Sequence, residues 1–182
     1  AGGQWIKAKG LELLEEVFKD NNKVNLIAED LGEASADAAV LRNKYGIPGM
    51  SILQFLFYDG DSINNIEEDT VLYTGTHDND TSVGWFESLN DKLSSDEIND
   101  LKSILNLDSK GMNWSMIEYS FRSRAKTVIV PVQDILGLGS DSRMNTPGTI
   151  SEKNWSWRMN GSELKGTMLR KMRDITEKAH RA

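Results

Sequence analysis

The segment that decides the fold reads TVLYTGTHDND and spans residues 70–80. Its first half, residues 70–75, is rich in β-branched and aromatic residues, which predicts a short buried strand. Its second half, residues 76–80, is strongly polar. In parallel α/β architectures the functional groups follow the carboxyl ends of the strands, so this segment predicts both a strand and a site.

Similar patterns on both sides of this segment predict the rest of the fold. Strands are also expected at residues 24–28, 50–57 and 127–132, and long loops at 58–69 and 137–160. Helical spacing predicts helices at 11–18, 35–45, 83–89, 98–105 and 114–125 and from about residue 162. The helix signals include Ser35, the capping-box pair Ser94 and Glu97, and Gly46 as a stop.

This alternation predicts an α/β fold with about four parallel strands and flanking helices. Four such units fit an open doubly wound sheet, or half of an eight-stranded barrel, which takes about 250 residues when whole. Periodicity alone does not separate the two architectures.

Composition excludes several classes of function. The 182 residues include no cysteine and two histidines, which excludes a disulfide scaffold, thiolate metal sites and a histidine-rich metal centre. The net charge of −7 is unfavourable for binding nucleic acid. No apolar run approaches the roughly 18 residues of a membrane span, and the N-terminus lacks the pattern of a signal peptide. We therefore expect no nucleic-acid partner, no membrane partner and no metal.

Acidic residues follow two of the predicted strands. Glu29 and Asp30 come after the first strand, and Asp78 and Asp80 come after the third, with His77 beside them. Carboxylates brought together from separate strand ends can act as general acid and base, as glycoside cleavage requires. The alternative is that these residues cap the following helices, which the helix dipole favours.

Several longer strings resemble glycoside hydrolase family 77, the 4-α-glucanotransferases or amylomaltases. The resemblance extends from about Trp5 to past Arg158. The strings are IAEDLG at 27–32, GM at 49–50, LQF at 53–55, YTGTHDNDT at 73–81, PVQDILGLG at 131–139, RMNTPG at 143–148 and NWSWR at 154–158.

The resemblance implies a (β/α)8 barrel that transfers α-1,4-glucan segments by a retaining, covalent mechanism without a cofactor. It implies that Glu29 is the general acid/base and that Asp78 is a third carboxylate that stabilises the transition state. Further positions are expected to bind the glucan or maltooligosaccharide: His77, Asn79, Asp30, Asp59, Asn145 and Pro147. A cytoplasmic location is expected as well.

One departure from the family decides how the chain is interpreted. The family's nucleophile lies in an Arg-Ile-Asp-His string at the fourth strand, and no such string occurs here. Residues 1–182 are therefore expected to form a single unit, the C-terminal half of a TIM-type barrel with strands five to eight. We expect this fragment to be inactive alone and to self-associate through open barrel edges. The alternatives are a non-catalytic glucan-binding fragment, a purely structural fragment and an α-amylase-type hydrolase.

Overall fold

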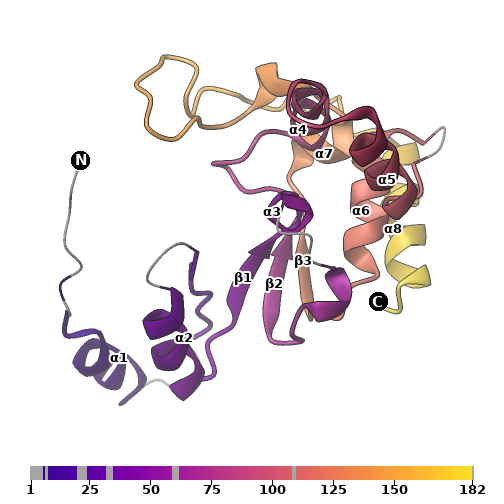
Figure 1. Cartoon of the computed structure of the whole chain (residues 1–182). Helices are drawn as coiled ribbons and strands as arrows, with labels where there is room; N and C mark the ends of the chain where they lie inside the picture. The colour runs from indigo at the N-terminus through magenta and orange to yellow at the C-terminus, as the bar shows by residue number, and fades with distance from the viewer. Residues whose placement is uncertain are drawn as a thin grey trace.

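The computed structural model describes residues 6, 8–19, 24–31, 35–58, 62–107 and 110–181. Its centre is a parallel sheet in the order β1-β2-β3, formed by β1 (Gly49–Ile52), β2 (Thr70–Tyr73) and β3 (Thr127–Ile129). Gly49 pairs with Thr70, and Val71 pairs with Thr127. Because all three strands run in the same direction, their carboxyl ends meet at one edge of the sheet (Figure 1).

Helices flank the sheet on two sides (Figure 1). On the side of β1 lie α1 (Gly10–Lys19) and α2 (Ser35–Lys44), and on the other side lie α5 (Ser95–Ile104), α6 (Met112–Phe121) and α8 (Gly166–Lys178). Three short helices lie near the carboxyl ends of the strands: α3 (Leu53–Tyr58), α4 (Ser82–Ser88) and α7 (Val132–Leu136). Single 3-10 turns are formed by η1 (Ile63–Asn65), η2 (Leu89–Asp91) and η3 (Ser140–Ser142).

Two groups of buried side chains hold the helices to the sheet. The larger includes Leu53, Leu72 and Met116, none of which is exposed, and it joins α3, β2 and α6. The smaller joins α6 to α8 through Ile117 and Ile175. Each fully buried aliphatic side chain contributes about 1.5–3 kcal/mol. The core is therefore concentrated on the side of the sheet where α4 to α8 lie.

Most of the predicted helices are confirmed. Helix α5 begins with the predicted capping box, in which the Ser94 hydroxyl accepts from the Glu97 backbone and the Glu97 carboxylate accepts from the Ser94 backbone. Gly46 has a φ of 60°, the left-handed conformation expected after a helix end. The last helix begins at Gly166 rather than near Ser162, because the Glu163 carboxylate accepts from the Asn160 backbone and closes a separate turn before it.

The predicted strand at residues 24–28 is wrong, since this segment forms no ladder. Ala28 donates one backbone bond to the Pro48 carbonyl, 2.9 Å away. In a parallel ladder the answering bond would run from the Met50 amide to the Ala28 carbonyl, but the Met50 amide bonds to the Asp30 carboxylate instead. The Asp30 side chain therefore replaces the backbone carbonyl that would accept this bond in a ladder.

The other three predicted strands are all too long, the one at 70–75 by two residues, since β2 ends at Tyr73. The apolar run at residues 50–57 is strand only to Ile52 and then becomes α3, because a short apolar run does not distinguish strand from buried helix. The strand predicted at 127–132 ends at Ile129, and Pro131 is the N-cap of α7. The predicted α/β fold with a parallel sheet and flanking helices is confirmed, with three strands in the described ranges.

In those same ranges, no helix combines the length and the apolar character needed to cross a membrane.

Candidate functional site

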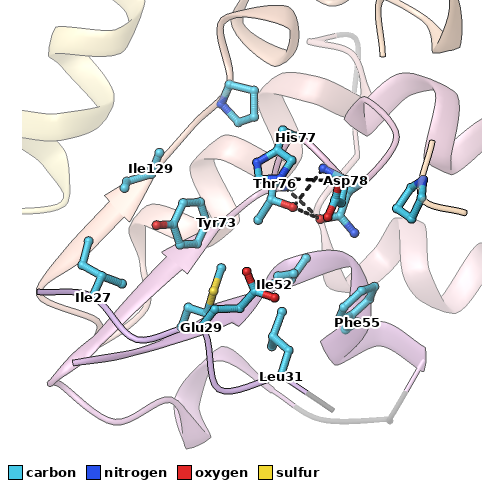
Figure 2. A pocket seen from close by; sticks show the side chains of 15 residues that line it. Ile27, Glu29, Leu31, Ile52, Phe55, Tyr73, Thr76, His77, Asp78 and Ile129 are labelled. Carbon is cyan, nitrogen blue, oxygen red and sulfur yellow. Dashed lines mark hydrogen bonds and ion pairs between the residues drawn. The ribbon is translucent and has the colours of Figure 1, made fainter. Parts of the chain in front are cut away.

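A cavity of about 540 Å³ opens at the carboxyl ends of the strands. Its wall is largely apolar, and two carboxylates, Glu29 and Asp78, reach it from different segments (Figure 2). The other lining residues are Ile27, Leu31, Met50, Ile52, Phe55, Tyr73, Gly75, Thr76, His77, Asn79, Ile129, Pro131 and Pro147. An apolar cavity with few convergent polar groups is the usual form of a ligand site.

Glu29 reaches the cavity from the segment 24–31, which is bonded to the start of β1. Its side chain is exposed, and no described residue forms a hydrogen bond or an ion pair with its carboxylate. Its neighbours along the wall include Ile27 and Leu31 (Figure 2). A carboxyl group with no internal partner can give a proton to a bound molecule and take one back.

Asp78 lies in the loop that follows β2 and is held by the long loop after α7. The Asn145 amide donates to Asp78 Oδ1 over 2.6 Å, and Arg143 Nη2 donates to the Asp78 backbone carbonyl over 2.6 Å. Arg143 Nε also donates to the Asn145 carbonyl, 2.7 Å away. The guanidinium therefore links the two loops, and one oxygen of the Asp78 carboxylate is already oriented.

The loop that carries Asp78 is closed by its own side chains. Asn79 Oδ1 accepts from both the backbone N–H and the hydroxyl of Thr76, at 2.9 and 2.8 Å. Gln54 of α3 donates to the Asp80 carbonyl over 2.8 Å, and Ser140 donates to the Asp80 carboxylate. The polar run after the strand therefore forms a fixed turn.

Beneath this loop lies Asp134 of α7, which is 1% exposed. Its Oδ2 accepts from the Thr74 hydroxyl over 2.6 Å, and its Oδ1 accepts from the Ser82 backbone over 2.7 Å. Burial raises the pKa of the Asp134 carboxyl above its ordinary value, although both hydrogen bonds act to lower it. One side chain thus fixes the start and the end of the 74–82 loop.

His77 lines the same cavity, with its Nε2 atom 3.5 Å from Asp78 Oδ1. Its ring packs on the indole of Trp155, with the ring centroids 5.0 Å apart and the planes at 41°. The His77 carbonyl accepts from the Asn145 backbone over 3.0 Å. The loop after α7 therefore contacts both the backbone and the ring of His77.

The structure brings most of the predicted site residues together. Five of them line the cavity: Glu29, His77, Asp78, Asn79 and Pro147. Asn145 contacts Asp78 directly. Asp30 is directed elsewhere, since it accepts from the Met50 backbone and lies 3.1 Å from Arg42 Nε. Asp59 lies outside the described residues.

Helix capping does not explain Asp78, although the Asp80 carboxylate does accept from the backbone N–H of Thr81 at the start of α4. The N-cap of α4 is Thr81, whose hydroxyl accepts from the Gly84 backbone over 3.1 Å, and Asp78 takes no part in it. The described residues also contain no group of three or more acidic, histidine or cysteine side chains that could hold a metal ion.

Two residues of the site did not emerge from the sequence as functional candidates. Arg143 and Asp134 lie within strings that resemble the family, but each acts on residues about sixty positions earlier in the chain. The sequence signal that could have identified them is their charge. Arg143 is a charged residue in the long loop, and Asp134 is a charged residue in a mainly apolar stretch.

Comparison with known proteins supports one family. The model of glycoside hydrolase family 77, described as 4-alpha-glucanotransferase, matches residues 1–165. The chain is 43% identical over 164 residues to a chloroplastic/amyloplastic 4-alpha-glucanotransferase of Arabidopsis thaliana, covering 88% of this chain and 28% of the relative. It is 41% identical over 181 residues to the Solanum tuberosum enzyme of the same description, covering 95% and 31%.

A solved structure agrees with this assignment. The amylomaltase from Streptococcus agalactiae in complex with acarbose matches with a TM-score of 0.88 and 33% identity, over 99% of this chain and 37% of that one. The chain thus spans about a third of the length of each of these proteins. On the match of the family model and of these relatives, the chain belongs to glycoside hydrolase family 77, the 4-α-glucanotransferase family.

Proposed function

We propose that the chain supplies the acid/base half of a retaining 4-α-glucanotransferase site, which acts on α-1,4-glucans and maltooligosaccharides. The observation that carries the proposal is that Glu29 and Asp78 line one cavity from different segments of the chain, with His77 beside Asp78 in the same wall. The family supports the same substrate class, and the similar Streptococcus agalactiae structure holds acarbose.

The unequal surroundings of the two carboxylates suit different roles. Glu29 has no partner among the described residues, so its carboxyl can protonate the leaving glycosidic oxygen and later deprotonate the acceptor hydroxyl. Asp78 accepts from Asn145 and is oriented, which suits a group that stays ionised and binds sugar hydroxyls as positive charge develops. His77 and Asn79 are placed to bind the same sugar, and Pro147 to form part of the groove wall.

Retaining chemistry requires a further carboxylate as nucleophile, about 5–5.5 Å from the acid/base. In the described part of the cavity wall the carboxylates are Glu29 and Asp78. We therefore propose that the nucleophile comes from another segment of polypeptide and that the 182-residue chain does not transfer glucan alone.

The exposed face of β3, an outer strand of the sheet, supports the larger barrel from which such a segment would come. Strands of parallel sheets are normally covered on both faces. Here Thr127 and Ile129 of β3 are exposed, Ile129 by 38%. We propose that residues 1–182 form one unit, half of a (β/α)8 barrel, whose open edges pair with the other half. In the isolated chain the same edges would favour self-association, which light scattering would detect. The cytoplasmic location stays a prediction, since the two plant relatives are chloroplastic or amyloplastic.

The test is complementation. The chain is mixed or co-expressed with the remaining part of the barrel, and the disproportionation of maltotriose is followed by chromatography. We expect activity in the mixture and none in the chain alone. Glu29→Gln should then lower kcat by a factor of about 10²–10⁴, because the proton donor is lost.

Glu177→Gln, on the exposed face of α8, is the matched control and should leave the rate unchanged. Disproportionation by the chain alone would contradict the proposed division of the site. Full activity of the Glu29→Gln mixture would contradict the role of Glu29. Glucose release without transfer products would favour an α-amylase-type hydrolase. Calorimetric binding of acarbose without any activity would favour a glucan-binding fragment.

A further inference from the structure

Trp155 combines three features that packing alone does not explain. The residue is 53% exposed, so it contributes little to a core. Its φ is 63°, a left-handed conformation that costs about 1–2 kcal/mol for a residue with a side chain. Its ring packs on His77, which lines the cavity. Backbone strain that persists next to a site indicates that the strained conformation has a use there.

The strain is maintained by three hydrogen bonds. The Trp155 backbone N–H donates to the Met144 carbonyl over 2.7 Å. Arg158 Nη1 donates to the carbonyls of Trp155 and Trp157, at 2.9 and 2.7 Å. The backbone of Trp155 is therefore fixed on both sides, and the direction in which its side chain leaves the backbone is fixed with it.

His77 needs such a support. Its side chain is 53% exposed, and its Nε2 atom, 3.5 Å from Asp78 Oδ1, is at the long end of any hydrogen bond. An exposed imidazole with one weak contact would rotate about χ2, and its nitrogens would not keep one direction at the cavity mouth. The indole contact covers one face of the ring and restricts that rotation.

We propose that Trp155 is a positioning residue that fixes the imidazole of His77 at the mouth of the cavity. Its effect on catalysis rests on the proposed function, in which His77 binds a sugar of the glucan. Its effect on the orientation of His77 does not, and it can be measured without any substrate.

The chain is well suited to that measurement, because it contains two histidines, His77 and His180. Both are observed by ¹H–¹³C NMR of their ring CH groups at one pH. Trp155→Gly removes the indole and accommodates the positive φ without strain, so the loop can keep its path. We expect the His77 ring signals to lose the upfield ring-current shift and their NOEs to position 155, while His180 stays unchanged.

Two further variants separate the indole contact from general effects. Trp155→Phe keeps an aromatic face and should retain most of the His77 shift. Trp157→Ala removes an indole from the same loop and should leave His77 unmoved. If Trp155→Gly leaves the His77 signals in place, or if Trp157→Ala moves them equally, the proposal is wrong.

In the complemented enzyme, Trp155→Gly should raise KM for maltotriose about three- to tenfold and leave kcat within about twofold, since a binding contact is lost rather than a reacting group. An unchanged KM would overturn the catalytic part of the proposal. Absence of activity in every mixture would count against the proposed function, and the NMR result would still decide the role of Trp155.

Discussion

Asp78 and Glu29 face the same cavity, but the chain fixes the two side chains to different degrees. Asp78 lies in a loop held by Asp134 from below, by Arg143 and Asn145 from the side and by its own turn. Glu29 lies on a segment joined to β1 by one backbone bond from Ala28 and by the Asp30 carboxylate. Residues of this chain are thus sufficient to orient the Asp78 carboxylate. The position of the Glu29 carboxylate depends more on the polypeptide that packs beside its segment.

Removal of the Asp134 side chain is expected to lower the free energy of unfolding most, because this side chain holds both ends of the 74–82 loop that carries Asp78. Asp134→Ala leaves the Thr74 hydroxyl and the Ser82 N–H without their acceptor, at about 1–3 kcal/mol for each buried group. We expect a loss of about 2–5 kcal/mol in the free energy of unfolding by urea. Asp100→Ala, on the exposed face of α5, should change it by less than about 0.5 kcal/mol. Equal losses in the two variants would contradict the role of Asp134 as the support of the loop.

A single methyl group at Gly49 should detach the segment that carries Glu29 from β1. A Cβ at Gly49 would lie 2.9 Å from Asp30 Oδ1 and 3.0 Å from Arg42 Cζ, so Gly49→Ala should displace Asp30. We expect a cost of about 1–3 kcal/mol, with faster hydrogen exchange at the amides of Ala28 and Met50.

Gly139→Ala is the matched control, because no atom lies within 4 Å of its Cβ and its φ is −82°. It should be neutral or stabilise the chain by up to about 1 kcal/mol. If Gly49→Ala leaves the exchange of Ala28 and Met50 unchanged, Asp30 is not what attaches the segment.

The contrast between the two sides also explains which parts the sequence could predict. The strand that begins at residue 70, the helix caps at Ser94 and Gly46 and the polar turn at 76–80 are local, so their patterns were sufficient, although the strand ends at Tyr73 rather than at residue 75. The residues of the cavity came from strings that resemble a family.

The errors lie where distant partners decide the structure. Residues 24–28 form no ladder because the Asp30 side chain, not a carbonyl, accepts from Met50. Residues 53–58 form a helix because Leu53 is buried against the core and Gln54 bonds to Asp80, 26 positions away. No local pattern contains these contacts.

A smaller loss of stability is expected when Arg143, which links the Asp78 loop to the loop after α7, is replaced. The Arg143 guanidinium uses Nε and Nη2 to reach two carbonyls at once, which the single nitrogen of lysine cannot do. Arg143→Lys should therefore cost about 1–2 kcal/mol and speed hydrogen exchange at residues 76–80. Lys153→Arg, at an exposed position of the same loop, should leave both quantities unchanged. If the exchange rates of residues 76–80 do not respond to Arg143→Lys, the hydrogen bonds of the Arg143 guanidinium do not hold the loop that carries Asp78.

The smallest expected effect is a change in how stability depends on pH. Burial raises the pKa of Asp134, so the folded chain binds this proton more tightly than the unfolded chain does. Between the ordinary and the raised pKa the folded state holds a proton that the unfolded state has lost, and the contribution of Asp134 to stability falls as pH rises.

Once protonated, Oδ2 can donate to Thr74 Oγ1 while Oδ1 still accepts from Ser82, and Asn at position 134 would reproduce the same pattern without titrating. Asp134→Asn should therefore equal or exceed the wild type in stability above the raised pKa, and the wild type should regain the difference as pH is lowered through it. Urea unfolding of both proteins at a series of pH values measures this difference with the other carboxylates cancelled, including Glu97, whose pKa is lowered by its bonds to Ser94. A wild type that loses stability relative to Asp134→Asn on acidification would mean that the hydrogen bonds outweigh burial at Asp134, and that the support beneath Asp78 is a stabilised carboxylate rather than a strained one.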